Sequence, residues 1–372
     1  MIDEAKKFIF ENAKVHKRKG YLSMLKRERV LNAIHHKEGD RIPKGESWIE
    51  GGLANRLLDA HYPLDYQHFQ RDLAVRNLLN IDLINLGDWP ADQIGVDNHG
   101  NPVFRSIYGY EYALGKSSKH ITKPAVEDIE DADKYQIPDI KKVSGKIITE
   151  FKNNTDLFVM GQIGGPVSML DEMFPMEDYM VYCLTNTVEM RILGEKVMEF
   201  EIAKAKLFLD SGADAIFFAD DIAFNSGAFL PPRIMDEIVY PFYRYAVKEI
   251  KKYKDVPIIF HSDGDLRKVM DNIVEAGFDG IQSLQPTANM NIAQIKKDYG
   301  NDLCLMGNID LNYVMTAATP EEVEEIVKRT IDIAAPGGGY ILSTCNSLID
   351  AIKPENALAM YQTGHTYEDY KY

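Results

Sequence analysis

Apolar residues along the chain follow two alternating patterns. Short apolar runs, typical of buried strands, are separated by longer segments in which apolar residues recur every three or four positions, as in amphipathic helices. The runs lie at residues 41–46, 82–86, 157–162, 215–219, 257–260, 280–284, 303–306 and 340–343. This alternation over 372 residues predicts an α/β fold, a (β/α)8 TIM barrel. A doubly wound sheet is the alternative, but no Gly-x-Gly-x-x-Gly sequence follows a first strand.

Two helices carry clear boundary signals. Thr319, Pro320 and Glu322 form an N-cap, a proline in the first turn and a capping-box glutamate. The segment 235–250 is amphipathic, and Pro241 within it predicts a kink.

Two further segments lie outside the strand–helix repeat. Residues 1–21 predict a helical arm that packs either on the barrel exterior or on a second copy of the chain, as in a homodimer. The barrel domain then spans residues 22–372. Between the second and third units lies a long insertion with a Tyr-rich hairpin that contains Tyr108 and Tyr110. Insertions of this length commonly form lids or binding loops, so we expect a hairpin lid at the mouth of the barrel.

Composition narrows the class of protein. A net charge of −15 with no basic stripe argues against nucleic acid as a partner, because phosphates would be repelled. The chain has three cysteines, a small and odd number, which argues against a disulfide framework. Acidic residues lie among the apolar residues of the N-terminus, which argues against a signal peptide. No uncharged apolar run approaches the roughly 20 residues that span a bilayer. We therefore expect a cytoplasmic protein with no membrane contact.

The strongest candidate site follows the apolar run at 257–260. His261 and Asp263 leave the end of this strand two residues apart, so their side chains should share a face. Cys345 follows the last predicted strand, and the three together supply the donors of a catalytic zinc site with an open fourth position. The alternative is a hydrogen-bonded His–Asp pair that holds a loop, with Cys345 as a buried, inert thiol.

Other polar residues follow predicted strands at the same end of the barrel. Asp220 or Asp221 could act as an acid, a substrate anchor or a fourth zinc ligand, or one of them could cap the following turn. The residues that we expect to contact substrate are Glu46, Gln162, Gln285, Asn308, Tyr108 and Tyr110.

Several motifs resemble the uroporphyrinogen decarboxylase superfamily over nearly the whole chain after about residue 22. They are Arg29-Val30-Leu31-Asn32-Ala33-Ile34 with Gly39-Asp40-Arg41-Ile42-Pro43, Ala219-Asp220-Asp221-Ile222, Phe260-His261-Ser262-Asp263-Gly264 with Glu275-Ala276-Gly277-Phe278-Asp279, and Gly307-Asn308-Ile309-Asp310. The resemblance implies a (β/α)8 barrel and one of two activities. One branch decarboxylates uroporphyrinogen without a cofactor, and the other comprises zinc methyltransferases that work with a corrinoid.

The motifs favour the methyltransferase branch. The decarboxylase holds its polycarboxylate substrate with arginines near the first strand, whereas residues 43–50 here contain two acids and no Arg. His261 and Cys345 match zinc-ligand positions of the other branch, and Asp263 stands where a Cys is expected. A carboxylate leaves zinc a stronger Lewis acid than a thiolate does, which suits an ether oxygen.

The resemblance therefore implies a methyltransferase that moves a methyl group from a small methoxylated, aromatic substrate to the Co(I) of a corrinoid protein, as in O-demethylation by anaerobes. Its cofactors would be Zn²⁺ and a cobalamin supplied by that partner protein, because the sequence contains no Asp-x-His-x-x-Gly motif. A cofactor-free decarboxylase, a metallohydrolase and a non-catalytic ligand-binding barrel are the alternatives.

Overall fold

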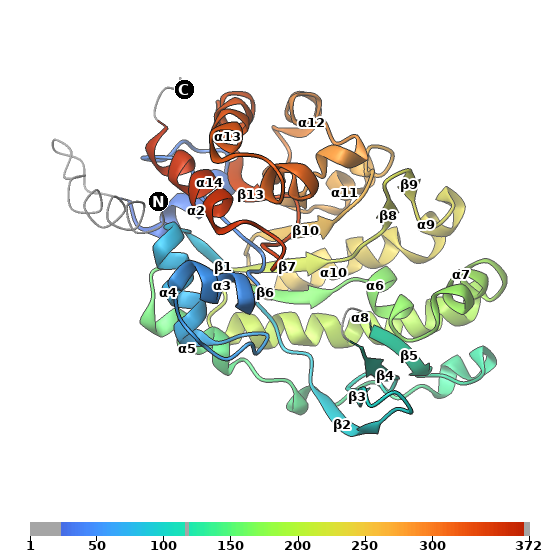
Figure 1. Ribbon diagram of the computed structural model, residues 1–372. Helices are drawn as coiled ribbons and strands as arrows, with labels where there is room; N and C mark the ends of the chain where they lie inside the picture. The colour runs from blue at the N-terminus through green and yellow to red at the C-terminus, as the bar shows by residue number, and fades with distance from the viewer. Residues whose placement is uncertain (1–23, 116–118, 368–372) are drawn as a thin grey trace.

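The computed structural model describes residues 24–115 and 119–367, and the predicted arm at 1–21 lies outside them. Its central element is a parallel sheet whose strands pair in chain order, consistent with the predicted barrel (Figure 1). The strands, from one edge to the other, are β1 (Leu83–Leu86), β6 (Phe158–Gly164), β7 (Ala215–Ala219), β10 (Ile258–Ser262), β11 (Gly280–Ser283), β12 (Cys304–Ile309) and β13 (Tyr340–Thr344).

The segment around Lys44 lies between the two edge strands, β1 and β13. The Gly45 amide donates to the Leu342 carbonyl at 2.8 Å, and the Leu342 amide donates to the Pro43 carbonyl at 3.0 Å. On the other side, the Asp82 amide donates to the Lys44 carbonyl at 2.8 Å. These bonds are those expected if the first predicted strand closes the sheet into a (β/α)8 barrel.

Helices follow most strands, and no helix among the described residues is long and apolar enough to cross a membrane. They are α2 (Lys26–Ile34), α3 (Gly51–Leu58), α4 (Phe69–Leu79), α5 (Lys146–Asn154), α6 (Pro166–Asp171), α7 (Met176–Thr185), α8 (Thr187–Asp210), α9 (Pro232–Ile238), α10 (Tyr240–Tyr253), α11 (Met270–Ala276), α12 (Ile292–Tyr299), α13 (Pro320–Ala334) and α14 (Pro354–Thr366). The capping box at Thr319 and Glu322 is confirmed. Pro241 lies in the first turn of α10, so the chain forms two helices rather than one kinked helix.

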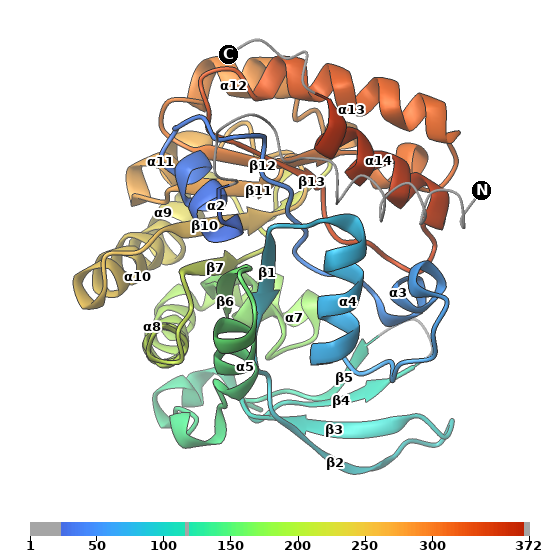
Figure 2. The same cartoon turned by 90° about the vertical axis from the view of Figure 1, so that its left-hand side faces the viewer.

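The predicted Tyr-rich hairpin belongs to a larger insertion. Four antiparallel strands form a separate small sheet beside the barrel, and the hairpin is its β3–β4 pair (Figure 2). The strands are β2 (Ala91–Val96), β3 (Pro102–Ser106), β4 (Glu111–Leu114) and β5 (Lys119–Lys123). Tyr108 and Tyr110 lie in the turn between β3 and β4, and both are buried rather than exposed. The insertion is therefore anchored by its own tyrosines.

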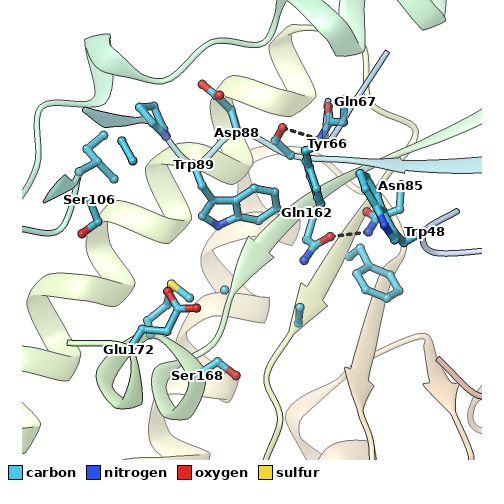
Figure 3. A pocket seen from close by; sticks show the side chains of 18 of the residues that line it. Trp48, Tyr66, Gln67, Asn85, Asp88, Trp89, Ser106, Gln162, Ser168 and Glu172 are labelled. Atoms are coloured by element: carbon cyan, nitrogen blue, oxygen red, sulfur yellow. Dashed lines mark hydrogen bonds between the residues drawn. The ribbon is translucent and has the colours of Figure 1, made fainter. Parts of the chain in front are cut away.

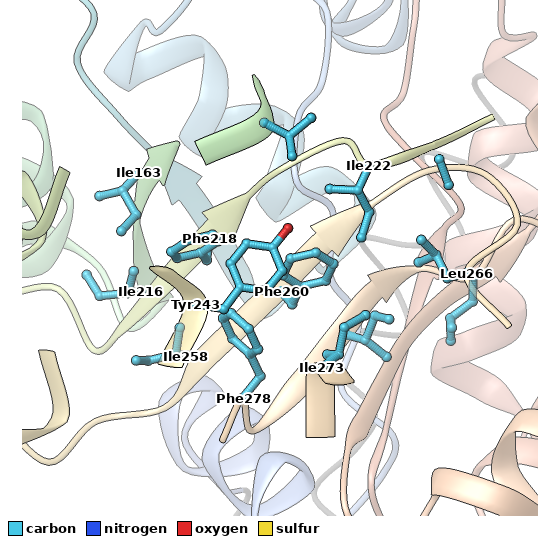
Figure 4. Close-up of a cluster of buried hydrophobic side chains, with 14 of the residues drawn as sticks. Ile163, Ile216, Phe218, Ile222, Tyr243, Ile258, Phe260, Leu266, Ile273 and Phe278 are labelled. Atoms are coloured by element: carbon cyan, nitrogen blue, oxygen red, sulfur yellow. The ribbon is translucent and has the colours of Figure 1, made fainter. Parts of the chain in front are cut away.

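Aromatic side chains fill the space between the sheet and the helices that cover it. Phe218 of β7 and Phe260 of β10 pack against Tyr243 of α10, with ring centroids 5.5 and 5.4 Å apart (Figure 4). Phe278, just before β11, completes the cluster at 5.1 Å from Phe260. Because β7 and β10 are held rigidly here, the residues at their carboxyl ends have fixed directions.

Candidate functional site

A cavity of about 1060 Å³ lies between the carboxyl ends of the strands and the insertion (Figure 3). Asn85 of β1, Gln162 of β6 and His261 of β10 reach it from the barrel. Aromatic side chains make up much of its wall: Trp48, Tyr66, Trp89, Tyr108, Tyr110, Tyr112 and Phe217. This is the end of a (β/α)8 barrel at which active sites are found.

Some predicted site residues line this cavity and others do not. His261, Asp221, Gln162, Tyr108 and Tyr110 are in its wall. Asp263, Cys345, Asp220, Glu46, Gln285 and Asn308 are absent from it.

The orientation of the His261 ring is fixed by its neighbours. Nδ1 forms a hydrogen bond with Oε1 of Gln282. Since an amide oxygen only accepts, Nδ1 carries the proton and Nε2 is directed elsewhere. Nε2 lies 3.7 Å from Oδ1 of Asp221, and the ring lies beside Phe217 with centroids 5.4 Å apart. His261 and Asp221 thus form a polar pair on the wall of the cavity.

The other two predicted zinc ligands are absent from the cavity wall. Asp263 accepts hydrogen bonds from Ser283 Oγ at 2.7 Å and from the side-chain amide of Asn346, so both carboxylate oxygens have partners. Cys345 is buried, and burial raises the pKa of its thiol to about 12, with the charge of Asp263 acting in the same direction.

These contacts do not fit zinc. Among residues 24–115 and 119–367, no group of three or more His, Cys, Asp and Glu side chains lies close enough to hold a metal ion. The ligand set of His261, Asp263 and Cys345 therefore stays a prediction, and we derive no step through it.

The two adjacent aspartates have different surroundings. Asp220 is fully buried and accepts hydrogen bonds from the Ser168 amide at 2.7 Å and the Tyr243 hydroxyl at 2.6 Å. It thereby holds the first turn of α6, and burial raises its pKa to about 7. Gly165 is required beside it, because a Cβ there would lie 2.3 Å from Asp220 Cβ. Asp220 therefore accepts hydrogen bonds from α6, which precedes it in the chain, and not from the turn that follows it. Asp221 instead lines the cavity, with its side chain 54% exposed.

Three residues predicted to contact substrate have other neighbours. Glu46 is fully buried and accepts from Thr344 Oγ1 at 2.9 Å and from the Tyr361 hydroxyl at 2.7 Å. Gln285 accepts from the Gly264 amide at 3.1 Å. Asn308 donates to the Leu284 and Met290 carbonyls at 2.6 and 2.9 Å and lines a separate cavity of about 600 Å³. Their bonds stabilise strand ends and loops.

Burial of Glu46 predicts a pH dependence of stability. Burial raises the pKa of this carboxyl from 4.5 to about 7, so between these pH values the folded protein holds a proton that the unfolded chain has released. The free energy of unfolding should therefore fall as pH rises through this window, by up to roughly 3 kcal/mol from this group. Urea denaturation of wild type and Glu46→Gln across pH 4–8 measures it. The difference in free energy of unfolding between wild type and Glu46→Gln should change with pH across this window. A difference that stays constant would show that Glu46 does not cause the pH dependence.

Sequence reasoning missed two tryptophans that shape the cavity. The chain has only two Trp residues, and both line it. Trp48 and Trp89 each lie no more than three residues after a predicted strand. This position at a strand end could have identified them as site residues. Trp89 packs over the backbone, since a Cβ at Gly87 would lie 2.1 Å from its ring.

Comparison with known proteins identifies relatives of two kinds. A family model described as "Uroporphyrinogen decarboxylase (URO-D)" matches residues 108–367. The methylcobamide:CoM methyltransferase MtaA of Methanosarcina barkeri is 23% identical over 198 residues, 52% of this chain and 56% of that protein. A uroporphyrinogen decarboxylase of Chlorobium phaeobacteroides is 24% identical over 298 residues, 72% of this chain and 79% of that protein. The match thus spans little more than half the length of the first of these relatives.

A solved structure shares the fold. A methyltransferase from Methanosarcina mazei superposes with a TM-score of 0.74 at 16% sequence identity. The superposition covers 93% of this chain and 99% of that one. At this identity the likeness concerns the fold alone.

Proposed function

The chain belongs to the uroporphyrinogen decarboxylase family, and within it we propose that it is a methyltransferase working with a corrinoid protein. In this proposal a small methylated donor binds in the cavity, and its methyl group passes to the Co(I) of a corrinoid held by a partner protein. The single observation that carries the proposal is the composition of the cavity wall, which is aromatic and acidic.

This wall disfavours the decarboxylase activity of the same family. Asp88, Glu172 and Asp221 line the cavity, whereas its described basic residues are Lys119 and Lys146, with no arginine. Lys119 is already paired with Glu172 at 3.0 Å. A substrate with many carboxylates would be repelled here and would find few cations to bind.

In this proposal, different residues of the cavity wall bind the methyl donor and orient it. The rings of Trp48, Tyr66 and Trp89 present flat apolar faces to the donor. His261, held by Gln282, and its neighbour Asp221 supply fixed polar groups near the strand ends. The wall would hold the methyl carbon where the corrinoid can reach it. It would therefore raise the rate of methyl transfer mainly by positioning the donor.

The methoxylated aromatic donor predicted from the sequence stays a prediction. Its ring would stack on these aromatic faces, which supports it. Its oxygen would have to leave as an anion, however, and that step calls for an electrophile such as the predicted zinc. Aliphatic ethers and methylated amines are further donor classes that the polar groups at the strand ends could accommodate.

The proposal is tested by incubating the chain anaerobically with Co(I) cobalamin and one candidate donor at a time. The panel comprises methoxylated aromatic compounds, methylated amines and methanol, and methylcobalamin formation is followed by its absorbance. We expect methylcobalamin with at least one class. Release of carbon dioxide from uroporphyrinogen without methyl transfer from any donor would contradict the proposal in favour of the decarboxylase. Donor binding without turnover would favour a non-catalytic barrel.

A further inference from the structure

We infer that the cavity binds a small methylated ammonium cation and that this cation is the methyl donor. The inference rests on the proposed function and deepens it by naming the class of substrate. It is carried by three independent features of the described residues: the arrangement of the rings, the charge of the wall, and the leaving group that the site can release unaided.

Three rings stand together on one side of the cavity. Trp48 and Tyr66 are stacked with centroids 3.7 Å apart, and Trp89 meets Tyr66 nearly edge-on, with centroids 5.9 Å apart. Figure 3 shows them across the opening from Glu172 and Ser168. Tyr66 is 51% exposed, so the part of its ring that Trp48 does not cover is open to a ligand. Aromatic walls of this kind bind quaternary ammonium groups through the negative faces of the rings.

Neighbouring rings of the same wall already attract ammonium groups of the protein. Lys119 Nζ lies 4.8 Å from the ring centres of both Tyr110 and Tyr112. Lys204 Nζ lies 5.0 Å from the ring centre of Trp89, on the side of α8. Rings of this wall thus already have ammonium groups as neighbours within the protein.

The charges of the wall favour a cationic ligand. Each of these two lysines has its own carboxylate, Glu172 at 3.0 Å from Lys119 and Glu201 at 3.2 Å from Lys204. Asp88 and Asp221 line the cavity and pair with no lysine or arginine among the described residues. Lys146 is exposed and is the remaining described cation of the wall. The described wall therefore carries three carboxylates and two lysines, an excess of negative charge.

The chemistry of the leaving group agrees with this binding preference. In transfer from a quaternary ammonium ion the C–N bond breaks, its electron pair stays on nitrogen, and a neutral tertiary amine departs. Co(I) supplies the electron pair of the new Co–C bond and is formally oxidised to Co(III). No proton and no metal electrophile is required, whereas an ether oxygen would need one. The described cavity offers rings and carboxylates for such a donor, while Asp263 and Cys345 are absent from its wall.

Calorimetry with a matched pair of ligands tests the inference. Choline carries a trimethylammonium group, and 3,3-dimethylbutan-1-ol is its neutral isostere. We expect wild type to bind choline at least tenfold more tightly than the isostere. Asp221→Asn, at an exposed position, should reduce this ratio severalfold, and Trp48→Leu should reduce it toward one. Asp178→Asn and Tyr245→Leu, both exposed and outside the cavity wall, should leave the ratio unchanged.

Three results would overturn the inference. One is equal affinity for the two ligands, and another is no choline binding up to millimolar concentration. The third comes from the cobalamin assay: methyl transfer from methoxylated aromatics but not from choline or other methylated ammonium ions upholds the proposed function and refutes this donor class. Tight choline binding without methylcobalamin from any donor would refute the proposed function and the donor role with it.

Discussion

Replacing Glu201 by alanine is expected to lower the free energy of unfolding by roughly 3–5 kcal/mol, the range for breaking a buried ion pair from one side. Glu201 is fully buried on α8 and lies 3.2 Å from Lys204, which is buried as well. It also accepts hydrogen bonds from the Tyr108 hydroxyl and, at 2.7 Å, from the Gly164 amide at the end of β6. The substitution leaves the Lys204 ammonium group buried without its carboxylate.

The same substitution should disturb the cavity, because Tyr108 belongs to the insertion and lines the wall. Urea denaturation gives the stability, and Glu199→Ala, exposed on the same helix, is the matched control. The double variant Glu201→Leu with Lys204→Met should recover much of the loss, since removing both charges removes the unpaired one. A loss in Glu201→Ala no larger than in Glu199→Ala would show that this ion pair does not anchor the insertion.

The second large effect concerns His261 and Cys345, which the sequence placed in one zinc site. Their substitutions should affect the rate of methyl transfer very differently. His261→Ala is expected to lower the rate of methyl transfer about 100-fold, the scale of losing a positioning contact. His261 lines the cavity and is held by Gln282. Cys345→Ala should keep the rate within about threefold of wild type, because the thiol is buried outside the cavity wall.

The assay is methylcobalamin formation with the best donor, accompanied by elemental analysis of zinc in wild type and both variants. Circular dichroism and urea denaturation show whether each variant is folded. If Cys345→Ala abolished transfer and also removed bound zinc, the predicted ligand set would be correct.

The fold could be predicted because its signals are local. Alternating apolar runs and helical patterns mark the strands and helices, and Thr319 with Glu322 begins α13 as expected. The extent of the insertion could not be predicted to the same degree. Strands β2 and β5 are largely exposed, so they lack the alternation by which a half-buried strand is recognised.

The site was harder to predict, because position along a strand does not fix the partners of a side chain. Asp220 and Asp221 are adjacent, yet one holds α6 and the other lines the cavity. Asp263 and Cys345 both follow strands, but Asp263 accepts a hydrogen bond from Asn346, and neither side chain lines the cavity. These outcomes depend on contacts between strands 20 to 83 residues apart, which no local pattern records.

Transfer of an isotopically labelled methyl group would show whether the chain is a corrinoid-dependent methyltransferase and which donor it uses. The chain is incubated with Co(I) cobalamin and a donor whose methyl carbon is ¹³C, in parallel for a trimethylammonium compound and a methoxylated aromatic compound. We expect ¹³C-labelled methylcobalamin from the ammonium donor, with the demethylated amine in equal amount. The rate should fall in Trp48→Leu but not in Tyr245→Leu. Absence of the label from cobalamin with every donor, at protein concentrations comparable to the cobalamin, would contradict the proposed function.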